Sequence, residues 1–158
     1  MNIPKHSFIC WLVMQRKLLT KDRTMRMKIT EDSDCMLCGR NTETIDHLYF
    51  ECTFSKMCLK EVCKWLGMNI KNTKVNGIWK RMARKANGRI GRAFTRSVLA
   101  AVIYQIWRAR NEAVWKGKVQ RPQVMLKQVQ HTCKHRSMEV VQKKKNMKGT
   151  RWIESLYS

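Results

Sequence analysis

The stretch that decides the fold runs from Cys35-Met-Leu-Cys38 through His47 to Cys52. Two thiols separated by two residues can bind one metal ion from a single tight turn, and a histidine and a third cysteine follow within the next fourteen positions. Three thiolates and one imidazole are a usual closed ligand set for structural zinc. We therefore predict one Zn²⁺ bound by Cys35, Cys38, His47 and Cys52, without an open position for a catalytic water.

Neighbouring residues support this ligand set. Gly39 directly follows the second cysteine, where a knuckle turn often requires a positive φ angle. The stretch 44–52 is typical of a short helical turn, with Thr44 as a candidate cap. The alternative is that the four residues are unrelated buried or disulfide-bonded side chains. The chain has seven cysteines, an odd number, and no secretory leader is evident, so we expect a reducing compartment rather than a disulfide scaffold.

Positive charge is concentrated in the second half of the chain. The whole sequence of 158 residues carries a formal charge of +22. Residues 1–66 hold 11 Lys and Arg against 8 Asp and Glu, whereas residues 67–158 hold 22 against 3. Such a field attracts polyanions, and phosphate backbones are the commonest partner because their neutralisation releases counterions. No apolar run is long enough to cross a membrane, and we expect no membrane partner.

The candidate nucleic-acid contacts lie between residues 79 and 110. An exposed tryptophan among cations can stack on an unpaired base while the cations hold its backbone. The alternatives are that Trp79 anchors its own helix in the core and that about half of the arginines are solvated helix flanks. The candidates are Trp79, Lys80, Arg81, Arg84, Lys85, Arg89, Arg92, Arg96, Arg108 and Arg110.

Apolar spacing predicts a mainly α fold in which a small zinc knuckle is embedded in short helices and followed by a basic helical region. Residues 4–30 should form one or two helices, with Phe8, Trp11, Leu12, Leu18 and Leu19 facing a core. A helix capped by Ser55 should end at Gly67, and a short basic helix should cover 78–86. After breaks at Asn87-Gly88 and Gly91, a long helix should run from about Ala93 to Lys116 and a last one from Pro122 to about Lys143. The basic tail should be frayed. We divide the chain into a zinc-binding domain at 1–67 and a basic helical region at 68–158.

Several separated blocks carry a family resemblance. They are Pro4-Lys-His-Ser-Phe-Ile-Cys-Trp11, Leu18-Leu-Thr-Lys-Asp-Arg23, the Cys35-x2-Cys38 pair, Glu43-Thr-Ile-Asp-His-Leu-Tyr-Phe-x-Cys52 and Trp65-Leu-Gly67. In this order they resemble the reverse transcriptase zinc-binding (zf-RVT) domain of plant non-LTR, LINE-type retrotransposons. The segment Ile106-Trp-Arg-Ala-Arg-Asn-Glu-Ala-Val-Trp115 is similar to one found downstream in the same polyproteins. Leu59 replaces the tryptophan usual in the family, an apolar residue for an apolar one.

The resemblance implies a non-catalytic module that binds template RNA or target DNA, most simply in the nucleus. It leaves open whether the chain is a retroelement fragment, a host gene recruited from one or a remnant. The alternative function is a structural subunit of a large ribonucleoprotein, for example in an organellar ribosome or polymerase complex of a mitochondrion or chloroplast.

The residues themselves give no sign of an enzyme. Only Glu112, Glu139 and Glu154 are acidic after residue 66, too few and too scattered for two-metal catalysis, and a Gly-rich phosphate loop is missing. His131 and His135 share a helix face and are candidate ligands for a second metal, but Cys133 points elsewhere, and a solvated helix face is the alternative.

Overall fold

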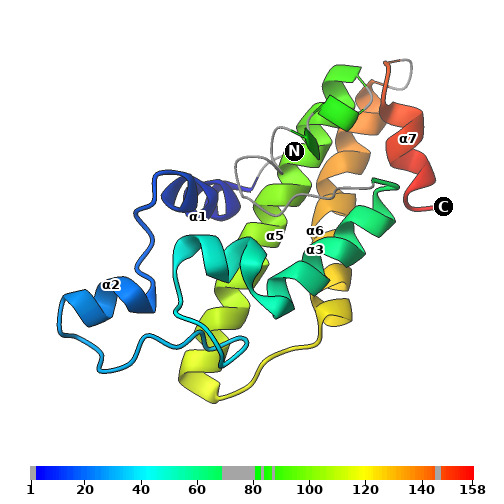
Figure 1. Cartoon of the computed structure of the whole chain (residues 1–158). Coiled ribbons are helices and arrows are strands. Elements are labelled where there is room, and N and C mark those ends of the chain that lie inside the picture. The colour runs from blue at the N-terminus through cyan, green and yellow to red at the C-terminus, as the bar shows by residue number, and fades with distance from the viewer. Residues whose placement is uncertain (1–2, 69–80, 83, 87, 145–146) are drawn as a thin grey trace.

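A computed structural model describes residues 3–68, 81–82, 84–86, 88–144 and 147–158 of the chain (Figure 1). The helices are α1 (Pro4–Met14), α2 (Lys21–Arg26), the π-helical turn η1 (His47–Glu51), α3 (Thr53–Trp65), α5 (Gly88–Lys116), α6 (Pro122–Lys143) and α7 (Thr150–Ser155). Within these residues, extended pairing is limited to one isolated antiparallel bridge between Asp34 and Thr42. The predicted mainly α fold is confirmed.

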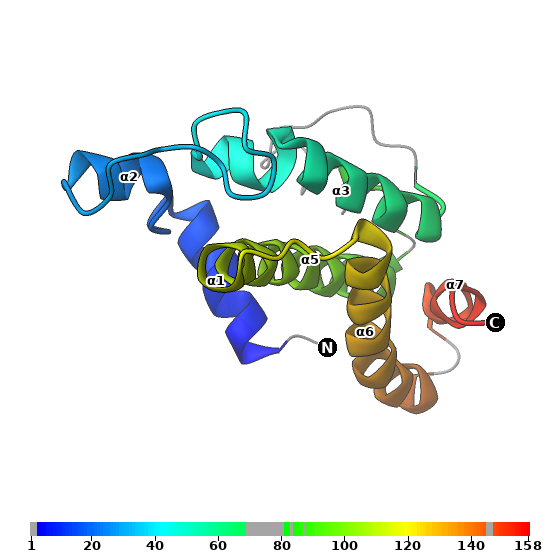
Figure 2. The same cartoon turned by 90° about the horizontal axis from the view of Figure 1, so that it is seen from below.

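Helix α5 is the central element. Helices α1 and α6 both pack on α5, and α3 packs on α6 and reaches α5 as well. Figure 2 shows α5 running between α1 and α6, with α3 and the zinc-knuckle segment on one side. An apolar stripe of α5 at helical spacing is buried along its length: Leu99, Val102, Ile103, Ile106, Ala109 and Ala113. Among the described helices, none is both long and apolar enough to cross a membrane.

The long helix begins earlier than we predicted, at Gly88 rather than near Ala93. Gly88 has a φ of +70° and lies against the backbone of Lys148, where an added Cβ would approach the carbonyl oxygen to 2.6 Å. Gly91 does not break the helix. It is buried, and a Cβ there would lie 3.5 Å from the ring of Trp152. Gly91 therefore permits the C-terminal segment to pack closely against α5. The local sequence does not show this, because the two segments are far apart in the chain.

The buried face of α1 also differs from the prediction. His6, Ile9, Cys10 and Val13 are buried, whereas Phe8, Trp11 and Leu19 are exposed by 58%, 49% and 56%. Leu18 is buried and Leu12 packs at the edge of the core, as expected. Residues 8–14 are all apolar, so the periodicity of this run could not identify the face that packs.

Helix α3 ends at Trp65, and Gly67 with a φ of +64° stands just beyond its C-cap, close to the predicted end, but the start of the helix is different. Cys52 occupies the N-cap position, and Ser55 lies inside the helix. The Ser55 side chain is buried and donates to the carbonyl of Leu48 in η1. Ser55 thus joins α3 to the preceding turn instead of capping the helix. Leu59, which stands where the resembled family usually has tryptophan, is buried.

The C-terminal segment is not frayed but folds back as α7. Trp152 and Tyr157 both make edge-on contacts with Phe94, and Ile153 is fully buried. The indole N–H of Trp65 donates to the carbonyl of Leu156 at 3.1 Å. The burial of these aromatic side chains therefore stabilises a folded C-terminal segment, although its sequence is strongly basic. Helix α6 has the predicted bounds, and residues 81–82 and 84–85 of the expected basic helix are helical.

Helices from both sides of residue 67 contact one another, α1 with α5 and α3 with α6. Their buried residues form one hydrophobic cluster. The division into 1–67 and 68–158 remains a prediction about sequence regions.

Candidate metal centre

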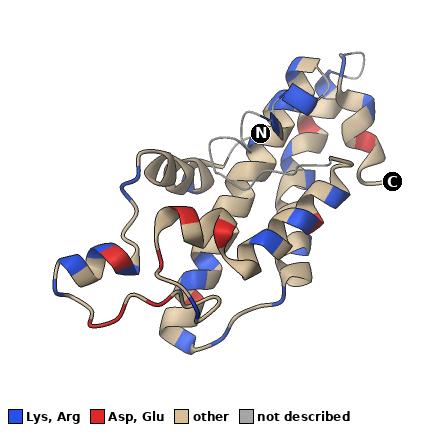
Figure 3. Ribbon diagram, viewed as in Figure 1, with Lys and Arg blue, Asp and Glu red and all other residues tan. Residues whose placement is uncertain are grey.

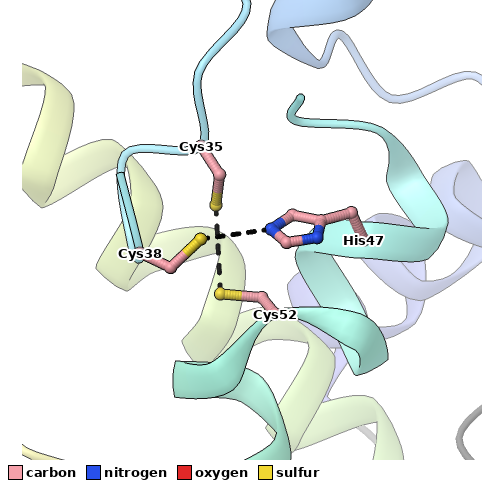
Figure 4. Close-up of side chains that lie close together, drawn as sticks. All are labelled: Cys35, Cys38, His47 and Cys52. Carbon is pink, nitrogen blue, oxygen red and sulfur yellow. Dashed lines mark hydrogen bonds between the residues drawn. The ribbon is translucent and has the colours of Figure 1, made fainter. Parts of the chain in front are cut away.

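Cys35, Cys38, His47 and Cys52 converge on one point, as Figure 4 shows. Their candidate ligand atoms all lie within 4.8 Å of one another. The Sγ atoms of Cys35 and Cys52 are 3.9 Å apart, and Cys38 Sγ lies 3.3 Å from Nε2 of His47. Zn–S bonds of about 2.3 Å at tetrahedral angles would place two sulfurs about 3.8 Å apart. The four side chains therefore fit a single tetrahedral zinc ion.

The first two ligands are presented by a tight knuckle. The N–H groups of Cys38 and Gly39 donate to the carbonyl of Cys35 at 3.3 Å and 2.7 Å. Gly39 has a φ of +63°, which confirms the predicted left-handed position. The backbone N–H groups of Leu37 and Cys38 are directed at the Cys35 sulfur and favour its thiolate. The turn thus places the two sulfurs at a spacing that suits one metal ion.

The other two ligands flank the η1 turn. Thr44 Oγ1 accepts a hydrogen bond of 3.1 Å from the N–H of His47, as predicted for a cap of this turn. The N–H of Cys52 then donates to the carbonyl of His47 at 2.6 Å. Cys52 is the N-cap residue of α3, and N–H groups from Phe54 and Ser55 point at its sulfur. A helix N-terminus is a favourable position for a thiolate.

The protonation of the metal-free ligands follows from these contacts. The Cys35 thiol donates to the sulfur of Cys52, which raises the pKa of Cys35 and lowers that of Cys52. Burial lowers the pKa of His47, so its imidazole is held in the neutral form that binds metal. A divalent cation would displace the shared thiol proton, because thiolates are the metal-binding form.

A buried ion pair connects the knuckle segment to α5, and sequence reasoning missed it. Glu43 is fully buried, and its carboxylate accepts from Arg110 Nη2 at 2.8 Å and from Arg110 Nε at 3.1 Å. The same carboxylate accepts the backbone N–H of Lys21 at 3.0 Å. Both residues stand in the family-like segments, but nothing in either segment indicates that they pair.

The remaining cysteines are core residues. Cys10, Cys58, Cys63 and Cys133 are buried, and burial raises the pKa of Cys58 and of Cys133 to about 12. His131 and His135 are exposed on α6 while Cys133 faces the core. Within the described part of the chain, the only cluster of three or more potential metal ligands is the one at Cys35. The solvated-face interpretation of the two histidines is therefore the better supported one.

The predicted nucleic-acid contacts fall into three groups. Trp79 and Lys80 lie outside the described residues. The side chains of Arg81, Arg84, Lys85, Arg89, Arg92 and Arg96 are exposed near or within the first turns of α5. Arg108 is exposed but pairs with Glu112 at 3.0 Å. Arg110 is occupied by Glu43 and by Asn111 Oδ1 at 3.2 Å, which leaves its guanidinium little freedom to reach a phosphate.

Comparison with protein families agrees with this geometry. Residues 1–58 match the family described as zinc-binding in reverse transcriptase. The matched range contains all four candidate ligands and ends within α3. No curated protein and no solved structure matches the chain. The resemblance inferred from the sequence blocks is confirmed for the zinc-binding region, whereas its plant LINE-type origin remains a prediction.

Proposed function

We propose that this zinc-binding domain of the reverse transcriptase type and the helices packed on it form a non-catalytic nucleic-acid-binding module, derived from the C-terminal end of a LINE-type retroelement polyprotein. The family match over residues 1–58 supports the zinc-binding part of this proposal. The nucleic-acid role rests on the charge of the helical part, where Lys and Arg outnumber Asp and Glu by 22 to 3 after residue 66. In this proposal zinc holds the fold and performs no chemistry, because all four positions are protein ligands.

The observation that carries the proposal is a gathering of cations at one end of the molecule. We call it the basic end: Lys85, Arg89, Arg92, Arg96, Lys148 and Arg151, all with exposed side chains. The start of α5 meets the C-terminal segment, because Gly88 lies against Lys148, just before α7, and Gly91 lies against Trp152 within α7. Figure 3 shows Lys and Arg around the start of α5. Glu154 is the acidic residue of α7, also exposed.

The spacing of these cations suits a phosphate backbone. Arg89, Arg92 and Arg96 are separated by three and four residues, so they project from one face of α5. Arginine offers five N–H donors in a planar fork that matches phosphate oxygens. A surface of this kind favours binding that depends on charge rather than on base sequence. We further propose the nucleus as the compartment, where such a module would meet its target DNA.

The test is a salt titration of binding to labelled RNA and DNA. A variant with Arg89, Arg92 and Arg96 each changed to Gln should bind more weakly at low salt. Its slope of log affinity against log salt should be shallower by roughly 2 to 3, since each neutralised phosphate contributes about 0.9 for duplex and 0.7 for single strands.

The matched control removes the same charge elsewhere. Lys56, Lys60 and Lys64 are exposed at four-residue spacing on α3, and changing them to Gln should leave the slope nearly unchanged. Equal losses in the two triple variants would show a diffuse charge effect rather than an interface at the basic end. A wild-type chain that binds neither nucleic acid at low salt would overturn the proposal.

A further inference from the structure

A pocket lies where the C-terminal helix α7 meets the end of α3 and the residues just before α5. Figure 1 shows α7 beside the last turn of α3 and the first turns of α5. The pocket has a volume of about 270 Å³, and residues from separate stretches of the chain line it: Leu66, Gly67, Met68, Lys85 and Trp152. None of them is a candidate zinc ligand, so the metal centre does not account for this pocket.

Aromatic contacts hold the walls of the pocket in place. The indole N–H of Trp65, in the last turn of α3, donates to the carbonyl of Leu156 just after α7. Phe94 of α5 makes edge-on contacts with Trp65 and Trp152, at centroid distances of 6.2 Å and 5.9 Å. Trp152 also lies over Gly91, where an added side chain would meet its ring. The helices that surround the pocket are thus joined beside it, and the pocket is a preformed feature of the fold.

The residues that line the pocket combine apolar surface with polar groups of both kinds. Leu66 and Met68 are buried, and the half-buried ring of Trp152 adds a planar aromatic wall. The ammonium group of Lys85 supplies hydrogen-bond donors. The backbone of Leu66 and Gly67 supplies carbonyl acceptors, since the peptide groups that end a helix lack partners within it. This combination suits a nucleobase, which is flat and carries donors and acceptors along its edge.

A phosphate group is a poorer occupant of the pocket itself. Helix α3 ends at Trp65, and the carbonyl groups at the C-terminal end of a helix carry partial negative charge that disfavours an anion. Phosphates are favoured instead at the rim, where the basic end begins. Lys85 belongs to both surfaces, and Arg151 directly precedes Trp152 in α7. A bound nucleotide would therefore place its base inside the pocket and its phosphates outside.

We propose that this pocket binds one unpaired nucleobase of a single-stranded nucleic acid whose phosphates lie on the basic end. The inference rests on the proposed function and specifies the form of its ligand. The pocket volume equals that of about nine water molecules at about 30 Å³ each, close to the roughly 8 to 11 non-hydrogen atoms of one base. A base pair does not fit, so the base must be unpaired, and its ring can stack on Trp152.

Gly67→Asn is a variant that obstructs the pocket with little damage to the fold. Gly67 has a φ of +64°, and asparagine is the residue that most readily replaces glycine in this conformation. A Cβ there meets no atom within 4 Å, so the amide side chain would extend into open space at the pocket wall. Gly117→Asn is the matched control, because Gly117 follows the last turn of α5 with a φ of +62° and the same open space.

The experiment measures the affinity of the full zinc-loaded chain for labelled probes of about 16 nucleotides, within the range that one small binding domain covers. The probes are a mixed-sequence single strand, the matching duplex and an abasic strand with the same phosphates. The wild type should bind the single strand about 5- to 150-fold more tightly than the abasic strand, the range expected for one stacked base. Gly67→Asn should remove most of this preference, whereas Gly117→Asn should match the wild type. Duplex affinity should change by less than about twofold in both variants, since it depends on the phosphates.

The outcomes separate the pocket from the general function. If the wild type binds the abasic strand as tightly as the base-bearing strand, the pocket does not bind a base, while charge-driven nucleic-acid binding stands. The same conclusion follows if Gly67→Asn keeps the full preference, or if both variants lose it equally. If the wild type binds none of the probes at low salt, the proposed function fails as well. The wild-type comparison needs no variant, and circular dichroism with zinc analysis verifies that both variants are folded.

Discussion

The knuckle segment at residues 35–52 and the central part of α5 are both buried, but they achieve burial by different means. In the knuckle segment the buried residues include Cys35, Glu43 and His47, whose polar groups need partners. In α5 the buried stripe is almost wholly aliphatic. A short irregular segment can thus be fixed by a metal and one ion pair, whereas a long helix is fixed by the apolar area that it removes from water.

Removing the metal should have the largest effect, and it should unfold the knuckle segment while α5 stays folded. Cys52→Ser should abolish stoichiometric zinc binding and unfold residues 30–60, because apparent zinc binding energies of about 10–16 kcal/mol are folding energy in such small sites. Hydrogen exchange should show protection lost across the knuckle segment but retained around Ile103 in α5. Metal analysis of the wild type should give one zinc per chain.

The control for this variant is Cys63→Ala, which alters a buried thiol outside the ligand set. It should keep its zinc and its exchange pattern, with only the cost of a small cavity. Full protection of residues 30–60 in Cys52→Ser would show that apolar packing alone fixes this segment.

Breaking the ion pair should have the next largest effect. Arg110→Ala leaves the fully buried carboxylate of Glu43 without its cation, and loss of one partner of such a pair typically costs about 3–5 kcal/mol. Urea unfolding of the zinc-loaded chain measures this. The double variant Glu43→Gln with Arg110→Met should recover much of the loss, since no charge is then buried. A cost below about 1 kcal/mol for Arg110→Ala would mean that the pair does not connect the two regions.

The same pair illustrates what the sequence could and could not predict. The four zinc ligands follow from a local spacing that only a few folds satisfy, and the α5 stripe follows from helical period, so both were predictable. The partner of Arg110 lies 67 positions away in the chain, and no local pattern connects them. For the same reason the sequence could not predict that Trp11 is exposed or that Trp152 packs against Phe94, because the burial of an aromatic residue depends on what packs against it.

A pH titration should show how the contact between α1 and α5 contributes to the stability of the protein. His6 is buried and stacks on Tyr104 with ring centroids 4.3 Å apart. Burial, with a smaller contribution from the charge of Lys5, lowers the pKa of His6 to about 4. In the unfolded chain its pKa is about 6.5, so at intermediate pH only the unfolded state is protonated. Stability contributed by neutral His6 should therefore be lost as the pH falls from about 6.5 to 4.

The measurement is the free energy of unfolding at pH 7 and pH 5 for the wild type and for His6→Gln. Acid release of zinc affects both chains equally, so the difference between them isolates His6. The wild type should lose more stability between the two pH values than the variant does. Equal losses would mean that His6 titrates alike in the folded and unfolded states.

The smallest effect is expected at Tyr49, next to the zinc ligands in sequence. Its side chain is fully buried, and within the described residues its hydroxyl has no hydrogen-bond partner. Removing an unsatisfied buried polar group while keeping its shape costs little or stabilises. Tyr49→Phe should therefore change the unfolding free energy by less than about 1 kcal/mol and leave zinc affinity unchanged. A larger loss would show that the hydroxyl is bound by an ordered water, and that the knuckle segment relies on one more polar contact than the aliphatic core of α5 does.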